Sequence, residues 1–191
     1  VVEDSAPQDL VLTISEEVTV TDATGFTVTI NGNEVAVNNI SNIGNTLTLN
    51  LASKVEAGDT VEFDYSDGNV KDTAGNSLIS IVDVVAANNV ADDTAPTLDS
   101  AAVEGAAPKD VVLTMSETVN FTDAAGFTVN VNGSPATISS INGDGTDTVT
   151  LTLESEVAEG DTVTLDYSGG NVTDTAGNDL GDISGKAVTN N

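Results

Sequence analysis

The sequence predicts an all-β protein built from two tandem antiparallel β-sandwich domains, and three observations lead to this fold class. The chain has 191 residues, which suits two domains of about 100 residues each. An internal repeat covers nearly the whole chain, so both domains should share one fold. Within each copy, apolar and polar residues alternate with a period of two, as in half-buried strands, and no segment has a helical period.

The repeat is about as long as a whole domain. Three pairs of matching segments define it: residues 9–16 with 110–117, residues 25–28 with 126–129, and residues 72–76 with 174–178. The offset is 101 residues for the first two pairs and 102 for the third, because the second copy has one additional residue in the region that matches residues 41–46. A repeat of this length indicates domains in series rather than the short units of a solenoid.

The apolar alternation stops at residues 91–96, where two acids precede a proline, and this break predicts the domain boundaries. Residues 2–3 match residues 103–104, so the N-terminal strand of the first module is expected to be partly truncated. A proline and so few residues leave the linker little freedom. We therefore expect a first module, a short acidic linker and a second module over residues 1–91, 92–96 and 97–191.

The predicted strands are short and lie between turn signals. Four alternating apolar runs match between the modules: Leu10, Leu12 and Ile14 with Val111, Leu113 and Met115; Phe26, Val28 and Ile30 with Phe127, Val129 and Val131; Leu47, Leu49 and Leu51 with Val149, Leu151 and Leu153; Val61, Phe63 and Tyr65 with Val163, Leu165 and Tyr167. Asn-Gly pairs at residues 31–32 and 132–133 predict tight hairpin turns. About seven short strands per 100 residues are typical of a sandwich with an immunoglobulin-like plan.

The charge balance limits the partners. There are 31 acidic residues against four lysines, giving a formal net charge of −27. Nucleic acid is excluded as a partner, because phosphate binding requires a basic surface. Repulsion among so many carboxylates suggests screening by high ionic strength or by bound divalent cations. The alternative is that the acidic surface serves solubility alone.

The missing residue types argue against catalysis. The chain has no His, Cys or Arg, so it cannot build a nucleophile triad, a histidine-ligated zinc site, a disulfide or an arginine clamp. Paired carboxylates remain, but the chain has few of the aromatic residues that usually line a glycan cleft. Tyr65 and Tyr167 are expected to be core residues whose hydroxyls bond near a loop, not sugar platforms. We expect no enzyme and no small-molecule substrate.

Membrane insertion is also unexpected. No stretch approaches 18 consecutive apolar residues, the length that predicts a membrane-spanning helix. No basic segment precedes an apolar run at Val1, so the sequence shows no export signal of its own.

A longer motif carries a family resemblance. The segment Asn-Val-Lys-Asp-Thr-Ala-Gly-Asn-Ser-Leu at residues 69–78, its copy at residues 171–180, the Ser-Glu-x-Val that closes an early strand and the Asp-Thr-Ala-Pro of residues 93–96 resemble the SwmB-type bacterial immunoglobulin-like repeats. They are also similar to the extender domains of large RTX-type surface adhesins. The resemblance implies a secreted protein at the bacterial cell surface, whose serial repeats hold a ligand-binding tip away from the cell. It also implies calcium at some of the junctions.

Immunoglobulin-like topology brings the loop after the second strand and the loop after the penultimate strand to the pole where the chain enters a module. Converging oxygen ligands suit Ca²⁺, which takes about six to eight of them. The alternative is that Asp-Thr-Ala-Gly-Asn is only a turn, in which Asp accepts N–H bonds and Gly supplies a positive φ. For the second module, the expected calcium ligands are Asp92, Asp93, Glu117, Asp123, Asp174 and Asn178.

The corresponding pole of the first module offers fewer candidates, because no linker precedes it in the sequence. A calcium site there should bind weakly or use waters in place of side chains. The candidate ligands at this pole are Glu16, Asp22, Asp72 and Asn76.

The leading hypothesis is therefore a structural extender, the stalk repeats of a large secreted bacterial adhesin, with calcium fixing the junction. We expect a monomer in solution whose partners are neighbouring repeats of the same chain. The alternative is an adhesive module that recognises a sugar, a protein or another surface, and a hydrolase is a minor third hypothesis. Two copies that differ by one inserted residue favour the spacer, because a ligand-binding copy usually diverges from its neighbours by insertion.

Overall fold

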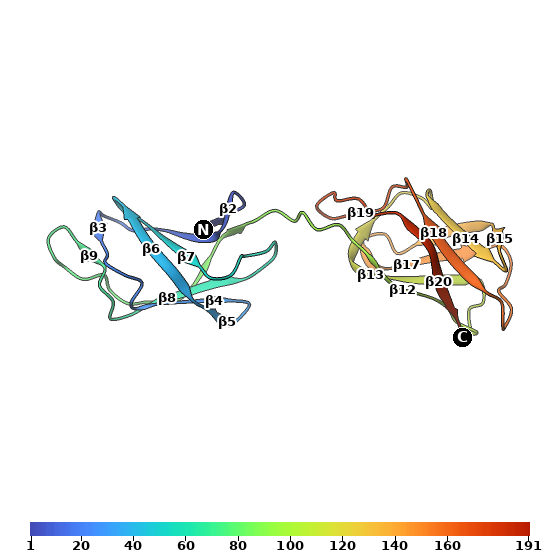
Figure 1. Cartoon of the computed structure of the whole chain (residues 1–191), viewed down its shortest axis with the longest axis horizontal. Coiled ribbons are helices and arrows are strands. Elements are labelled where there is room, and N and C mark those ends of the chain that lie inside the picture. Colours follow the sequence, from blue (N-terminus) through green and yellow to red (C-terminus); the bar gives the residue numbers. More distant parts are fainter. The chain divides into compact units, whose positions relative to one another are not determined.

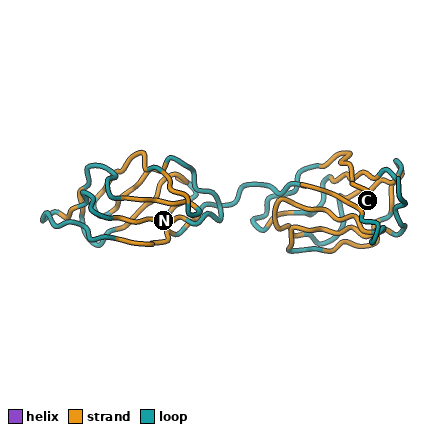
Figure 2. The backbone as a smooth tube through the Cα atoms, turned by 90° about the horizontal axis from the view of Figure 1, so that it is seen from below, coloured by secondary structure: helices purple, strands orange, loops and turns teal.

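The computed structural model describes residues 1–191 and divides into two compact units, Val1–Asp92 and Asp93–Asn191. Every regular element is a β-strand, and Figure 2 shows only strands and loops in both units. No helix is present that could cross a membrane. The all-β tandem sandwich predicted from the sequence is confirmed.

The first module contains eleven strands, most of which are labelled in Figure 1. They are β1 (Val2–Glu3), β2 (Ala6–Thr13), β3 (Val18–Thr19), β4 (Phe26–Ile30), β5 (Asn33–Val35), β6 (Val37–Ile43), β7 (Thr46–Leu51), β8 (Val61–Tyr65), β9 (Lys71–Asp72), β10 (Ile81–Ala86) and β11 (Asn88–Asn89). One layer has the order β11-β1-β2-β7-β6 and the other has the order β10-β8-β4-β5. Strands β3 and β9 form a separate two-stranded ribbon.

The second module repeats this order, and its two layers are joined into one sheet. Its strands are β12 (Leu98–Val103), β13 (Asp110–Asn120), β14 (Phe127–Val131), β15 (Ser134–Ala136), β16 (Ile138–Asn142), β17 (Thr146–Leu153), β18 (Val163–Tyr167), β19 (Thr173–Asp174) and β20 (Ile183–Asn190). They run in the order β15-β14-β18-β20-β12-β13-β17-β16. Strand β20 pairs antiparallel with β18 and, near its end, parallel with β12, so it joins the two layers.

The alternating apolar runs point into the cores, as the period of two predicts. Leu47, Leu49 and Leu51 of β7 are fully buried, and so are their counterparts on β17. Burying one such aliphatic side chain contributes about 1.5–3 kcal/mol. Each sandwich is therefore held by an aliphatic core of its own.

Each core also contains one tyrosine with a satisfied hydroxyl. The Tyr167 oxygen accepts a hydrogen bond from the Val172 N–H at 3.0 Å, and the Tyr65 oxygen accepts one from the Val70 N–H at 3.0 Å. A Cβ on Gly170 would lie 2.7 Å from the Tyr167 hydroxyl oxygen, so only glycine fits beside this ring. The expectation that both tyrosines are core residues bonded near a loop is confirmed.

The Asn-Gly pairs form the hairpin turns that the sequence predicts. Strands β4 and β5 are joined by Asn31 and Gly32, which have φ values of 52° and 75°. Strands β14 and β15 are joined by Asn132 and Gly133, at 51° and 79°. Positive φ at both central residues gives the twist that a two-residue hairpin needs.

Candidate metal site at the linker pole of the second module

Two short strand pairs bring the predicted loops together. In the second module, β13 pairs with β19 so that Val119 lies opposite Asp174. In the first module, β3 pairs with β9 in the equivalent way, with Val18 opposite Asp72. We call the end of each sandwich that contains this pair its linker pole, because in the second module it is where residues 93–97 join the sheet. The convergence expected from topology is therefore present in both modules.

The segment after β19 is a tight turn built around Asp174. Its Oδ1 atom accepts N–H bonds from Ala176, Gly177 and Asn178 at 2.9, 2.6 and 2.8 Å. Gly177 has a φ of 98°, which favours glycine. The turn interpretation of Asp-Thr-Ala-Gly-Asn is thus correct, and it also fixes the direction in which the carboxylate points.

Asp174 is nearly enclosed, with 1% of its surface exposed. Removal from water is the largest single influence on this carboxyl and favours the neutral acid. The hydrogen bonds from Asn178, Gly177 and Ala176 together outweigh it, so the pKa of Asp174 lies below its ordinary value. The buried group is consequently an anion at neutral pH.

Two further carboxylates lie beside this anion. Ligand oxygens of Asp92, Glu117 and Asp174 all lie within 4.8 Å of one another, with Asp92 and Glu117 half-buried. The Asn178 amide donates to Asp174 Oδ2 at 2.7 Å and to the Thr94 carbonyl at 3.5 Å. Three of the six residues expected to bind calcium therefore form one carboxylate cluster, and a fourth, Asn178, supports it.

The other two predicted ligands are outside this cluster. Asp93 is exposed. Asp123 accepts hydrogen bonds from the Ala125 N–H at 2.8 Å and from the Asn171 amide at 2.9 Å, so it stabilises a separate loop. Sequence position alone could not distinguish the acids of the cluster from Asp93 and Asp123. The asparagine that opens the repeated motif, Asn171, was the one signal that Asp123 has a hydrogen-bond partner of its own.

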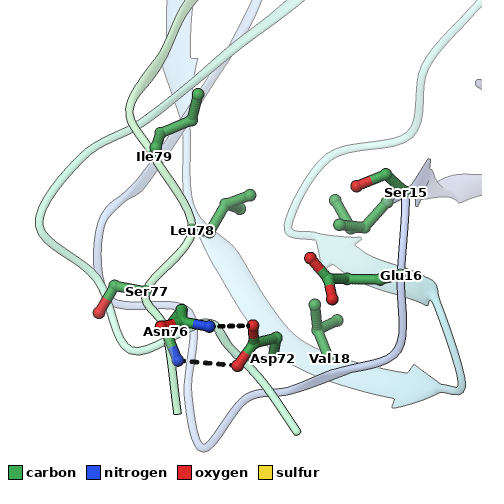
Figure 3. A pocket seen from close by; sticks show the side chains of 9 residues that line it. Ser15, Glu16, Val18, Asp72, Asn76, Ser77, Leu78 and Ile79 are labelled. Carbon is green, nitrogen blue, oxygen red and sulfur yellow. Dashed lines mark hydrogen bonds between the residues drawn. The ribbon is translucent and has the colours of Figure 1, made fainter. Parts of the chain in front are cut away.

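The first module has the same turn without the carboxylate cluster. The Asn76 N–H and side-chain amide donate to the two oxygens of Asp72 at 2.7 and 2.6 Å, and these bonds, the side-chain one foremost, lower the pKa of Asp72. Glu16 and Asp72 line one pocket, with the Glu16 side chain directed toward this turn (Figure 3). Only one group of three close carboxylates exists in the chain, and it is not here.

Asp22 also lies outside a metal cluster. Its Oδ1 atom accepts hydrogen bonds from the Thr24 N–H at 2.9 Å and from the Asn69 amide at 2.6 Å. The bonds from Thr24 come first among the causes that lower the pKa of Asp22, and the bond from Asn69 adds to them. Asp22 and Asp123 thus hold equivalent loops in the two modules.

The carboxylates of Asp92, Glu117 and Asp174 are hard oxygen ligands of the kind that divalent cations such as Ca²⁺ and Mg²⁺ take in proteins. Asp174 Oδ2 accepts one protein hydrogen bond, so it keeps a lone pair for a further interaction.

Comparison with protein-family models identifies a family of bacterial repeats. The model of the SWM repeat family, described as "putative flagellar system-associated repeat", matches residues 6–70 and 91–171. These two ranges correspond to the two modules and cover most of the chain. No curated protein matches the chain.

Proposed function

Because the chain belongs to the SWM repeat family, a family of bacterial repeats, we propose that its two modules are structural spacers in a large secreted surface adhesin. The family description connects such repeats with a flagellar system. A spacer needs modules that fold independently and follow one another directly, and tandem sandwiches meet this need. In the proposed role, the repeats lie outside the bacterial cell and separate a ligand-binding part from its anchor.

The observation that carries this proposal is the equivalence of the two modules. Both have the same strand order, the same Asn-Gly hairpins and the same tyrosine packing. Neither has an enlarged loop that would mark it as a specialised binding copy. The absence of His, Cys and Arg supports the same conclusion for catalysis, so we expect no turnover of glycans or peptides.

Binding assays on the whole 191-residue chain test the spacer role. We expect no saturable binding to an array of glycans or to immobilised extracellular-matrix proteins. Saturable binding that is removed by substituting a single loop would instead identify an adhesive module.

We further propose that calcium binds at the linker pole of the second module. Asp92, Glu117 and Asp174 would supply the carboxylate oxygens, with waters completing the six to eight ligands that Ca²⁺ takes. A divalent ion would offset repulsion among three nearby negative charges. Because Asp92 belongs to the linker, binding would restrict the linker and so the motion between modules.

Calorimetry with the calcium ion alone tests this site. We expect one binding event with a dissociation constant of about 10⁻⁴–10⁻³ M, and at ten times that concentration about 1.4 kcal/mol of added stability. Glu117→Gln should abolish the binding event, and chelation should change the small-angle scattering profile of the unmodified chain.

Glu16→Gln in the first module is the matched control, because Glu16 is the counterpart of Glu117. Binding that is the same in both variants and in the unmodified protein would show that calcium associates diffusely with the acidic surface. The spacer role would survive that result, but the calcium site would not.

A further inference from the structure

The first module has an apolar groove at the edge where its two layers meet. It lies between β2 and β10, has a volume of about 250 Å³, and is lined by Val1, Leu12, Ile14, Phe63, Ile81 and Val84 among others. Val84 lies opposite Phe63 in the β8–β10 pair, so its side chain is on the core-facing side of the sheet. It is nevertheless 38% exposed.

In the second module, strand β12 fills the corresponding space. Leu98, Ser100 and Ala101 of β12 lie opposite Met115, Thr114 and Leu113 of β13. On its other side, the ammonium group of Lys186 on β20 donates to the carbonyls of Leu98 and Asp99 at 3.5 and 3.3 Å. The first half of β12 therefore lies between β13 and β20, whose counterparts in the first module are β2 and β10.

The residues before β12 extend the cover over the core from β12 toward the linker pole. Thr97 and Ser116 exchange two hydrogen bonds of 2.9 Å, one from the Thr97 N–H to the Ser116 hydroxyl and one from the Ser116 N–H to the Thr97 carbonyl. Pro96 is buried and lines a small cavity with Leu180 and Ile183. Residues 94–101 thus form one continuous covering segment, of which residues 98–101 belong to β12.

The equivalent path in the first module is open along its whole length. A second pocket, whose lining includes Ser15, Leu78 and Ile79, lies at the linker pole beside Asp72 (Figure 3). Ile14 borders both cavities. Ile79 is 80% exposed. Ile14 and Leu78 are only half-buried, whereas their counterparts Met115 and Leu180 are 3% and 7% exposed.

The pairing of Val1 with β2 shows how a further strand residue could occupy the groove. Val1 and Val11 exchange two hydrogen bonds, from the Val11 N–H to the Val1 carbonyl at 2.8 Å and from the Val1 ammonium to the Val11 carbonyl at 2.7 Å. In the second module the matching residues, Ala102 and Val112, are also paired. Extending the ladder backward from Val1 leads directly into the groove.

We propose that this groove is a strand-acceptor site, and that its occupant is a segment of the same protein that runs into Val1 with the character of residues 94–101. A small residue directly before Val1 would lie opposite Leu12, an apolar residue four positions before Val1 would pack on Ile14, and a proline six positions before would cover Leu78. The groove belongs to the first module alone, so its occupation is independent of the calcium site in the second module.

The test adds the eight residues Thr-Ala-Pro-Thr-Leu-Asp-Ser-Ala, copied from positions 94–101, before Val1 of the whole chain. We expect the Ser15 amide, the counterpart of Ser116, to gain at least about tenfold protection from hydrogen exchange. The thermal midpoint of the first module should rise by about 5 °C or more, and binding of an apolar dye should fall. The control extension has Asp in place of Leu, and it should give none of these changes.

The second module provides the reverse experiment. Leu98→Asp should expose the corresponding groove and reduce the protection of the Ser116 amide, and Leu98→Ala serves the same purpose if the aspartate variant does not fold. Equal protection and equal midpoints for the Leu and Asp extensions would overturn the proposal. So would dimerisation of the Leu-extended chain, because the strand would then be exchanged between copies.

Discussion

The carboxylate of Asp174 remains ionised inside a protein because its turn is arranged to hold an anion. Three backbone N–H groups converge on one oxygen, and the Asn178 amide bonds the other. Hydrogen bonds to a charged group are stronger than those to a neutral one. The cost of removing the carboxylate from water is therefore met locally, whether or not a cation is bound.

This environment makes the second module sensitive to acid. The pKa of Asp174 in the folded protein is below its ordinary value of 3.8, so the unfolded chain takes up the proton first as the pH falls. The contribution of Asp174 to stability is complete well above the unfolded pKa of 3.8 and is lost as the pH falls through the lower pKa of the folded protein. In chelator, we expect the free energy of unfolding to begin to decrease at about pH 5 and to continue to decrease as the pH falls through the folded pKa of Asp174.

Asp174→Asn should reduce this pH dependence for the second module, as followed by its NMR signals during urea unfolding. The exposed Asp182→Asn is the matched control and should leave the dependence unchanged. If both variants retain the full pH dependence, the acid sensitivity arises from other carboxylates, such as Asp161, whose pKa is lowered first by its bond from Asn132.

At the level of elements, the Asn-Gly hairpins determine where β14 and β15 meet. The Asn132 amide also bonds Asp161 at 2.7 Å, and the Thr162 N–H donates back to Asn132 Oδ1 at 3.0 Å, so the turn is tied to the loop before β18. The same bonds join Asn31 to Asp59 and Thr60 in the first module. The turn thereby ties the start of β18 to the hairpin whose strand β14 pairs with it.

Gly133→Ala tests the backbone requirement of this turn. Gly133 has a φ of 79°, and a Cβ added there would have no neighbouring atom within 4 Å, so the only penalty is conformational. We expect a loss of about 1–2 kcal/mol in the free energy of unfolding, measured by urea denaturation. Gly181→Ala is the control, because Gly181 also has open space but no positive φ. An equal effect of the two substitutions would show that the turn imposes no special demand.

At the level of the whole molecule, charge is the dominant property. The net charge is −27, and the few lysines neutralise little of it. Lys54 forms an exposed ion pair with Glu56 at 3.2 Å, while Lys109 and Lys186 donate to backbone carbonyls. The compact state brings the carboxylates closer together than the unfolded chain does, so repulsion opposes folding.

Monovalent salt should therefore stabilise both modules. Raising the ionic strength from about 0.01 M to about 0.15 M shortens the screening length from about 30 Å to about 8 Å. We expect the thermal midpoints to rise over this range and then level off, as measured by calorimetry. Sucrose at matched osmolality is the control for exclusion effects, and midpoints that do not respond to salt would contradict the argument.

Much of the fold could be predicted from the sequence because its determinants are local. The period of two places alternate residues on opposite faces, and the Asn-Gly pairs specify hairpin turns, so strand positions and fold class follow without long-range information. The internal repeat supplies the number of modules. The turn at residues 174–178 was predicted on the same basis, because its glycine and its two polar ends act within five residues.

The tertiary structure alone decided which acids meet. Asp22 and Asp123 lie in loops that the sequence places at the linker poles. Each nevertheless accepts its hydrogen bonds from residues that hold its own loop, and neither joins a carboxylate cluster. The pentapeptide Asp-Thr-Ala-Gly-Asn occurs identically in both modules, yet Asp174 is 1% exposed and Asp72 is half-buried. The local sequence specifies the turn, whereas burial depends on a covering segment from elsewhere in the chain, which residues 94–101 supply only in the second module.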